Sequence, residues 1–230
     1  KQLFEEYLNN YSKEVSIKVY NNLRYNEVKE LETLKKYIKE KSIWLVGGDG
    51  WAYDIGFGGI DHVLSLKENV NILVLDTEVY SNTGGQSSKS TRQGAIAKFN
   101  SNGKRENKKN LVDIALAHKD VYVGTISLGA NYNHTIKTLV EAEKYNGPSI
   151  IIAYAPCIAH GIKKGMNNSI NEEKLVTESG YFPLFTYNPE TKHASINSNV
   201  NFDKLDEVFK NENRYRSSEE LLKGTKENII

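Results

Sequence analysis

Two polar motifs, each directly after an apolar run, contain the residues of this sequence best suited to hold a phosphate and a metal ion. The first is the turn at residues 47–50, Gly-Gly-Asp-Gly, which follows the apolar run 42–46. The second is the segment 76–82, Asp-Thr-Glu-Val-Tyr-Ser-Asn, which follows the apolar run 71–75. A glycine turn that opens a helix offers unpaired backbone N–H groups and the positive end of the helix dipole, and both favour a phosphate. The first motif therefore predicts a site for a phosphorylated cofactor.

The acid inside the glycine turn indicates that a metal ion accompanies the phosphate. Asp49 and a phosphate bound in the same turn would repel each other unless a cation lay between them. Magnesium takes about six oxygen ligands, usually one or two from the protein and the rest from phosphate and water. One carboxylate, one side-chain hydroxyl or amide and one backbone carbonyl, drawn from Asp49 and segment 76–82, would meet that demand. The competing interpretation of Asp49 is a turn aspartate that caps the helix.

The two motifs together resemble a known family. A GDG turn with an asparagine after the next strand, here Asn82, is the thiamin-diphosphate signature. The sequences GDGWAYDIG and DTEVYSNTGGQ, with GAIAKF further on, are similar to the C-terminal domain of pyruvate:ferredoxin (flavodoxin) oxidoreductase. The similarity extends from about residue 41 to residue 189, and it implies the thiamin-diphosphate-binding fold.

The resemblance also implies the cofactors and the residues of the site. Thiamin diphosphate and Mg²⁺ would be the cofactors, with Asn82 placed next to the reacting centre as a catalytic residue. The metal ligands would be Asp49, Thr77 and Val79. The complete predicted set of cofactor-binding residues is Gly48, Asp49, Gly50, Trp51, Thr77, Val79 and Asn82.

Cys157 has two interpretations. By itself it reads as a small buried hydrophobic residue just past an apolar run. In the resembling family the matching segment contributes one thiolate to a 4Fe-4S cluster. Such a cluster needs four ligands, and this chain contains one cysteine. We therefore expect Cys157 to serve as a ligand only together with three cysteines outside this chain.

The activity implied by the resemblance is the coenzyme A-dependent oxidative decarboxylation of pyruvate to acetyl-CoA and CO₂, with electrons passed to ferredoxin or flavodoxin. The glutamate that activates the aminopyrimidine ring would come from another domain of the same polypeptide, so this chain would supply half a site and be inactive alone. Two alternatives stay open. One is a non-catalytic binding or assembly module. The other is a nicotinamide enzyme, although the turn lacks G-x-G-x-x-G spacing and Asp49 would repel the pyrophosphate.

The order of apolar and helical segments predicts an α/β fold with a doubly wound, mostly parallel sheet. Runs dense in β-branched residues and without alternation are typical of strands covered on both faces. Helical segments separate or follow these runs, as in a parallel sheet, whose ligands bind beyond the carboxyl ends of the strands. The predicted strands are 42–46, 71–75, 121–128, 148–154 and 182–187, and the helices are 109–118, 131–145 and 171–179. The predicted domains are a helical lead-in at 1–40, a cofactor-binding domain at 41–200 and a C-terminal helical tail at 201–230.

Composition narrows the possible functions. With 230 residues, 39% of them hydrophobic, the chain can bury a sizeable core. A net charge of +1 gives no support for binding nucleic acid or membrane. The single cysteine fits a reducing compartment, so we expect a cytoplasmic protein. The first residue is Lys1 rather than methionine, and we expect a fragment of a longer polypeptide that forms a homodimer.

Other polar and glycine positions have simpler interpretations. Lys104, Arg105, Lys108 and Lys109 predict either a solvated basic loop or a surface that steers an acidic electron-transfer partner. Glu78 is expected to use its backbone as a ligand or to face solvent. We expect three glycines to allow close packing of a helix on a strand, namely Gly56, Gly58 and Gly59. The five histidines show no ligand spacing, so a zinc site is not expected.

Overall fold

The strands form where the sequence has runs of β-branched and aliphatic residues, which fit the pleated surface of a buried sheet. The computed structural model describes residues 42–230, so the lead-in predicted for residues 1–40 lies outside the described residues. The strands are β1 (Trp44–Gly48), β2 (Asn71–Asp76), β3 (Tyr122–Ile126), β4 (Ser149–Tyr154), β5 (Phe185–Asn188) and β6 (His193–Ile196). The predicted strand at 182–187 begins later than expected because Pro183 has no N–H group to give to a ladder.

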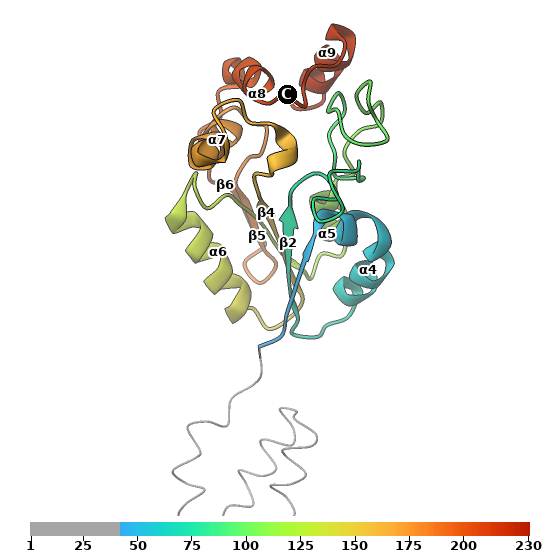
Figure 1. Cartoon of the computed structure of the whole chain (residues 1–230). Coiled ribbons are helices and arrows are strands. Elements are labelled where there is room, and N and C mark those ends of the chain that lie inside the picture. The colour runs from blue at the N-terminus through green and yellow to red at the C-terminus, as the bar shows by residue number, and fades with distance from the viewer. Residues whose placement is uncertain (1–41) are drawn as a thin grey trace, which may run out of the picture. The chain divides into compact units, whose positions relative to one another are not determined.

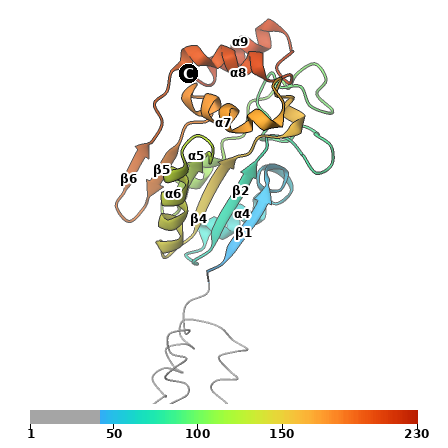
Figure 2. The ribbon, with the colours of Figure 1, turned by 60° about the vertical axis from the view of Figure 1, so that its left-hand side comes forward.

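These strands form one sheet in the order β1-β2-β4-β3-β5-β6. Figure 2 shows β1, β2 and β4 side by side, with β5 and β6 toward the other edge. The pairs β1–β2, β2–β4 and β3–β4 are parallel, while β3–β5 and β5–β6 are antiparallel. The mostly parallel sheet predicted from the sequence is therefore confirmed. Every residue of β3 is buried, as the unbroken apolar run predicted.

Helices lie on both faces of the sheet, with α6 on one side and α4 and α5 on the other (Figure 1). The predicted doubly wound arrangement is thus confirmed. The α-helices are α4 (Phe57–Ser65), α5 (Leu111–Ala117), α6 (Tyr132–Lys144), α7 (Ser169–Glu178), α8 (Leu205–Asn211) and α9 (Glu219–Glu227). Short turns of other helix types are η3 (Gly50–Ile55), η4 (Ile158–His160), η5 (Met166–Asn168) and η6 (Phe202–Lys204). The boundaries of the predicted domains stay predictions.

Asparagine side chains begin the two helices that flank β3. Asn110 accepts a hydrogen bond from the Asp113 N–H at 3.2 Å, and Asn131 accepts one from the His134 N–H at 2.9 Å. Each bond satisfies an N–H group that has no partner inside its own helix.

Among residues 42–230, no helix combines the length and the apolar character needed to cross a membrane.

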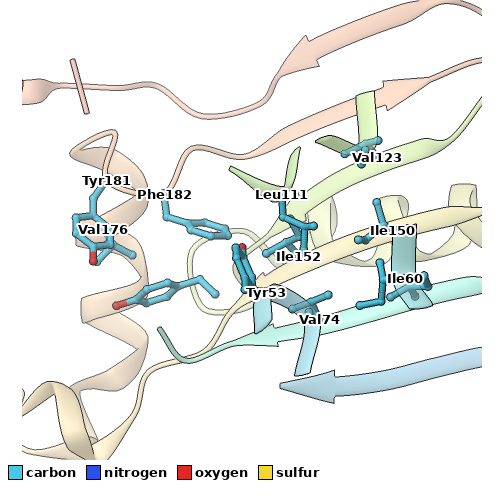
Figure 3. Packing of buried hydrophobic residues seen from close by; sticks show 14 of the residues in the cluster. Tyr53, Ile60, Val74, Leu111, Val123, Ile150, Ile152, Val176, Tyr181 and Phe182 are labelled. Atoms are coloured by element: carbon cyan, nitrogen blue, oxygen red, sulfur yellow. The ribbon is translucent and has the colours of Figure 1, made fainter. Parts of the chain in front are cut away.

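The core divides across the two faces of β4. Ile150 and Ile152 point to the face covered by α4 and α5, where Ile60 and Leu111 pack against them (Figure 3). Ile151 belongs to the opposite face, on the side of α6. The run of three isoleucines thus fills both layers, because successive side chains of a strand alternate between faces.

The close helix packing expected of three glycines is wrong for two of them. Gly58 and Gly59 are exposed, and a Cβ atom on either would meet no other atom within 4 Å. A Cβ atom on Gly56 would lie 2.3 Å from Trp51 Cδ1, so that glycine makes room for a side chain of its own turn. The sequence motif was therefore misread as a packing signal.

Because Ile150 lies in this core, we expect Ile150→Ala to lower the stability of the fold strongly. Ile150 has no exposed surface, so the substitution should lower the free energy of unfolding by ~2–5 kcal/mol through lost burial and a residual cavity. Urea unfolding followed by circular dichroism measures the change. The control Ile196→Ala removes a side chain that is 72% exposed and should change the free energy by less than ~0.5 kcal/mol. Equal losses in the two variants would contradict this description of the core.

Candidate functional site

The register of the parallel strands brings the two polar motifs together. Gly48 pairs with Leu75 across β1 and β2, so the residues that follow each strand leave the sheet side by side. Asp76 in turn pairs with Tyr154 across β2 and β4. The chain after β1, the chain after β2 and the chain after β4 therefore meet at one edge of the sheet, as predicted.

Three oxygen atoms from the predicted metal ligands gather at this edge. Thr77 Oγ1 lies 2.9 Å from Asp49 Oδ1 and 3.0 Å from the Val79 carbonyl oxygen. A hydroxyl group has one proton, so Thr77 can donate to only one of these two acceptors at a time. A cation among the three oxygens would be attracted by all of them. The donor set is the one that Mg²⁺ prefers, namely a carboxylate, a hydroxyl and a carbonyl, so the residues present fit this metal.

The burial and the raised pKa of Asp49 also fit a divalent metal ion at this position. Its side chain is 1% exposed, and Oδ2 accepts a hydrogen bond of 2.5 Å from Ser88 Oγ. Burial raises the pKa of Asp49 to about 6, and the nearby charge of Asp76 adds to the effect. Hydrogen bonds from Ser88 and Thr77 and the charge of Lys108 oppose it only in part. Ionised Asp49 is thus short of positive charge, which a divalent ion would supply.

A cavity of about 200 Å³ opens beside this oxygen cluster. Six of the seven predicted cofactor-binding residues line it, and the seventh, Thr77, reaches it through its contact with Asp49. Asn82 lies on the exposed loop at this cavity. The lining residues are Gly48, Asp49, Gly50, Trp51, Ile55, Val79, Tyr80, Ser81, Asn82 and Thr83.

The glycines of the first motif allow aromatic rings to close over the turn. A Cβ atom on Gly50 would lie 2.3 Å from Tyr80 Cε1, and one on Gly47 would lie 2.4 Å from Trp51 Cε3. The Tyr80 hydroxyl donates to the Gly50 carbonyl at 3.3 Å. Any larger residue at position 50 would separate the two motifs, so the close approach requires glycine there.

The expectations for Glu78 and for the basic loop are corrected by the structure. Glu78 does not face solvent, because its carboxylate is fully buried and paired with Lys108 Nζ at 2.8 Å. Lys104 Nζ donates to the Thr91 carbonyl at 2.7 Å, and Lys109 Nζ donates to the Tyr53 carbonyl at 3.1 Å. Three of the four cations in the predicted basic loop therefore hold the interior together, and they do not form a steering surface.

Cys157 is linked to the segment of the predicted ligand Thr77 through His160, a residue that sequence reasoning missed. The cysteine is 8% exposed, and its N–H donates to His160 Nδ1 at 3.4 Å. His160 Nε2 lies 2.7 Å from the Thr77 carbonyl oxygen, so it carries the proton of a neutral ring. Burial lowers the pKa of His160 to about 3. The turn after β4 is thereby fixed to the segment that holds Thr77.

The loop after the second motif supplies hydroxyl donors that were also missed. Ser88 donates to Asp49, Ser90 donates to Asp76 Oδ1 at 2.5 Å, and Thr91 donates to the Glu78 carbonyl at 2.5 Å. The sequence Ser-x-Ser-Thr at 88–91 could have indicated these contacts, because each hydroxyl group has one proton to donate to a buried acceptor.

The raised pKa of Asp49 predicts how stability depends on pH when divalent ions are removed with EDTA. Ionisation of the buried carboxylate costs folding free energy; the cost is small below about pH 4, grows up to about pH 6 and is constant above it. Asp49→Asn should therefore stabilise the chain more at pH 7.5 than at pH 4.5, by roughly 1–2 kcal/mol. Urea unfolding at the two pH values measures the difference. A change of equal size at both would show that Asp49 carries no such cost.

Comparisons with known proteins show which family the chain is similar to. The model of the family described as "Thiamine pyrophosphate enzyme, C-terminal TPP binding domain" matches residues 31–153. The chain is 56% identical over 175 residues to a pyruvate:ferredoxin oxidoreductase from Moorella thermoacetica, covering 74% of this chain and 15% of that protein. It is 53% identical over 164 residues to a pyruvate-flavodoxin oxidoreductase from Nostoc sp., covering 71% of this chain and 14% of that protein.

A third relative is a pyruvate dehydrogenase [NADP(+)] from Cryptosporidium parvum, which is 53% identical over 181 residues, covering 77% of this chain and 9% of that protein. The resemblance predicted from the sequence is confirmed. This chain spans less than a sixth of the length of each of these relatives. Because the family model matches more than half of its 230 residues, the chain belongs to the family of thiamine pyrophosphate enzyme C-terminal TPP binding domains.

Proposed function

We propose that this chain binds the magnesium-diphosphate end of thiamin diphosphate as one part of a 2-oxoacid oxidoreductase. The observation that carries the proposal is the cluster of Asp49, Thr77 and Val79, in which one hydroxyl proton faces two acceptor oxygens. Membership of the TPP-binding family supports the identity of the cofactor. The identities with pyruvate oxidoreductases support the reaction class.

In this proposal each ligand has a distinct role. Asp49 gives Mg²⁺ its negatively charged protein ligand, Thr77 gives a hydroxyl oxygen and Val79 gives a carbonyl oxygen. Diphosphate and water complete the coordination, as is usual for this metal. Ser88 holds Asp49 Oδ2 by a hydrogen bond, which leaves Oδ1 on the side of Thr77. The chain would thus hold its three ligand oxygens in place for the metal.

Thiamin diphosphate, when bound, supplies an electron sink for the loss of CO₂ from a 2-oxo acid. The residues of this chain fix the end of the cofactor that does not react. Asn82 is the residue that we place next to the reacting centre, where its amide can donate to an oxygen that gains negative charge. Glu78 is unsuited to activate the aminopyrimidine ring because Lys108 and Arg214 already pair with its carboxylate. That role falls to a glutamate of another domain.

The substrates and partners follow from the relatives. All three are named for pyruvate, and two are named for ferredoxin or flavodoxin. We therefore propose pyruvate as the 2-oxo acid, coenzyme A as the acetyl acceptor and a ferredoxin or flavodoxin as the electron acceptor. Since three of the predicted basic-loop cations already bind groups of this chain, the acceptor would be recognised by a surface other than that loop.

Cys157 would contribute one ligand to a 4Fe-4S cluster completed by cysteines outside this chain. Its support is the contact through His160 with the segment that carries Thr77, which would keep a cluster near the cofactor. Cluster ligation needs four thiolates. We therefore expect residues 1–230 alone to be purified without iron.

The experiment that tests the proposed site is calorimetric titration of the chain with thiamin diphosphate in Mg²⁺ and in EDTA. Binding should require the metal, and Asp49→Asn should weaken it by roughly 30- to 150-fold, because a buried charge-assisted contact contributes ~2–3 kcal/mol. Asp61→Asn changes the same kind of side chain on the neighbouring helix α4, where it is half exposed, and serves as the matched control. NAD⁺ is titrated in parallel. Binding of thiamin diphosphate that survives both EDTA and Asp49→Asn, or binding of NAD⁺ instead, would refute the proposal.

Asn82 gives a separate prediction for the complete oxidoreductase. Asn82→Ala should leave the melting temperature nearly unchanged, because an exposed loop residue usually contributes under ~1 kcal/mol to stability. Turnover should fall by ~10²-fold or more, the scale for loss of a transition-state donor. Asn102→Ala, at another exposed loop position, should leave both quantities unchanged. Turnover of Asn82→Ala within a factor of two of the parent enzyme would reduce Asn82 to a turn residue.

A further inference from the structure

Glu78 lies between the two proposed ligands Thr77 and Val79 in a backbone conformation that is unusual for a glutamate. Its φ angle is 56°, in the left-handed region. For a residue other than glycine this conformation is strained and persists only where surrounding contacts enforce it. The contacts that enforce it here are therefore part of what shapes the metal-binding segment.

The Glu78 carboxylate is held from three directions. Lys108 Nζ lies 2.8 Å from Oε1, and Arg214 Nη1 lies 2.8 Å from Oε2. The Tyr181 hydroxyl donates to Oε2 at 2.5 Å. All of these groups are buried or nearly so. At this depth an unpaired carboxylate would be strongly destabilising, so these partners, together with Arg92 Nε at 3.6 Å from Oε1, fix where the side chain lies.

The backbone of the same residue is held as well. The Glu78 N–H donates to Asp76 Oδ1 at 3.1 Å, and the Glu78 carbonyl accepts from Thr91 Oγ1 at 2.5 Å. Asp76 is itself paired with Lys108 Nζ at 2.6 Å. Side chain and main chain of Glu78 are thus fixed by one connected network.

The consequence for the site is geometric. Because the chain reverses at Glu78, the side chain of Thr77 and the carbonyl of Val79 come within 3.0 Å of each other on the side of Asp49. An extended residue at position 78 would carry Val79 farther along the strand, about 3.3 Å for each residue, and would remove this contact with Thr77. The left-handed conformation is therefore a condition for the oxygen cluster.

Two of the anchors come from outside the part of the chain that matches the family. The family model ends at residue 153, whereas Tyr181 follows α7 and Arg214 follows α8. Arg214 Nη2 donates to the Tyr181 hydroxyl at 3.0 Å, and Arg214 Nε donates to Glu212 Oε2 at 2.6 Å. The C-terminal part of the chain thus contributes a buried, pre-organised cation to the segment that holds the metal ligands.

We propose that Glu78 is a positioning residue for the metal site, and that Arg214 and Tyr181 act through it to hold Thr77 and Val79 in their binding arrangement. The inference rests on the proposed function, because it takes Asp49, Thr77 and Val79 as the metal ligands. The C-terminal residues Tyr181 and Arg214 would thus affect metal affinity, although they lie far from the metal ligands in the sequence.

The test measures Mn²⁺ affinity rather than turnover. Mn²⁺ is titrated into the full chain in the presence of thiamin diphosphate, and the free ion is followed by its EPR signal. Glu78→Gln keeps the size of the side chain and removes its charge, so it should weaken Mn²⁺ binding by about 10- to 100-fold, the range for partners that orient metal ligands. Arg214→Met should weaken it to a similar degree. The double variant should be no worse than the weaker-binding single variant, because both substitutions break the same contact.

The matched control is Glu172→Gln. Glu172 is fully buried on α7, and its carboxylate accepts a hydrogen bond from Asn211 Nδ2 at 3.4 Å rather than from a partner of Glu78. The same substitution there should leave Mn²⁺ affinity within about twofold of the parent chain. Circular dichroism confirms folding of each variant. If Glu78→Gln does not fold, Arg214→Lys takes its place, since it keeps the charge but loses the planar fork, and it should also weaken Mn²⁺ binding.

The outcomes separate the two proposals. Mn²⁺ binding that is lost in Asp49→Asn but unchanged in folded Glu78→Gln and Arg214→Met would overturn the positioning role and leave the proposed function standing. Binding that does not depend on Asp49 would overturn both. Strictly additive losses in the double variant would also contradict a role for Arg214 that acts through Glu78.

Discussion

A carboxylate buried at the edge of a parallel sheet needs positive charge beside it, and within residues 42–230 Asp49 has no cation in direct contact. Its hydrogen-bond partners are two neutral hydroxyl groups, and burial raises its pKa to about 6. The same edge holds two further buried carboxylates, Asp76 and Glu78, and both of these contact Lys108. The protein therefore neutralises two of three neighbouring acids with its own side chains. The third, Asp49, has no such partner among the described residues, which fits the metal site that we propose.

The strands and loops of the fold place these charged groups next to one another. The parallel register brings the ends of β1, β2 and β4 to one edge of the sheet. The acids that follow these strands therefore lie close together. In the hydroxyl-rich loop after the second motif, Ser88 and Ser90 each donate one hydrogen bond to a buried acid. The cations that pair with Glu78 lie in the loop before α5 and in the segment after α8. Three buried carboxylates, Asp76, Glu78 and Glu212, face three cations, Arg92, Lys108 and Arg214.

The sequence predicted the sheet, and it predicted that the proposed oxygen ligands lie together at its edge, because both depend on short segments. Apolar runs locate buried strands, and a polar residue directly after such a run must lie at the edge of the sheet, which placed Asp49 and Thr77 correctly. It did not predict the partners of Glu78, because Lys108, Tyr181 and Arg214 are distant in sequence and nothing in their local pattern distinguishes a buried cation from a solvated one. The misread basic loop and the exposed glycines Gly58 and Gly59 have the same cause, since burial is decided by tertiary packing.

The most direct test of the account is a crystal structure of the chain with Mn²⁺ and thiamin diphosphate, with anomalous scattering used to locate the metal. We expect one strong anomalous peak at about 2.0–2.3 Å from Asp49 Oδ1, Thr77 Oγ1 and the Val79 carbonyl oxygen, with diphosphate oxygens completing the shell. Diphosphate bound in the cavity with no metal peak at Asp49, or a metal peak elsewhere, would contradict the claim that this buried carboxylate is reserved for a divalent ion.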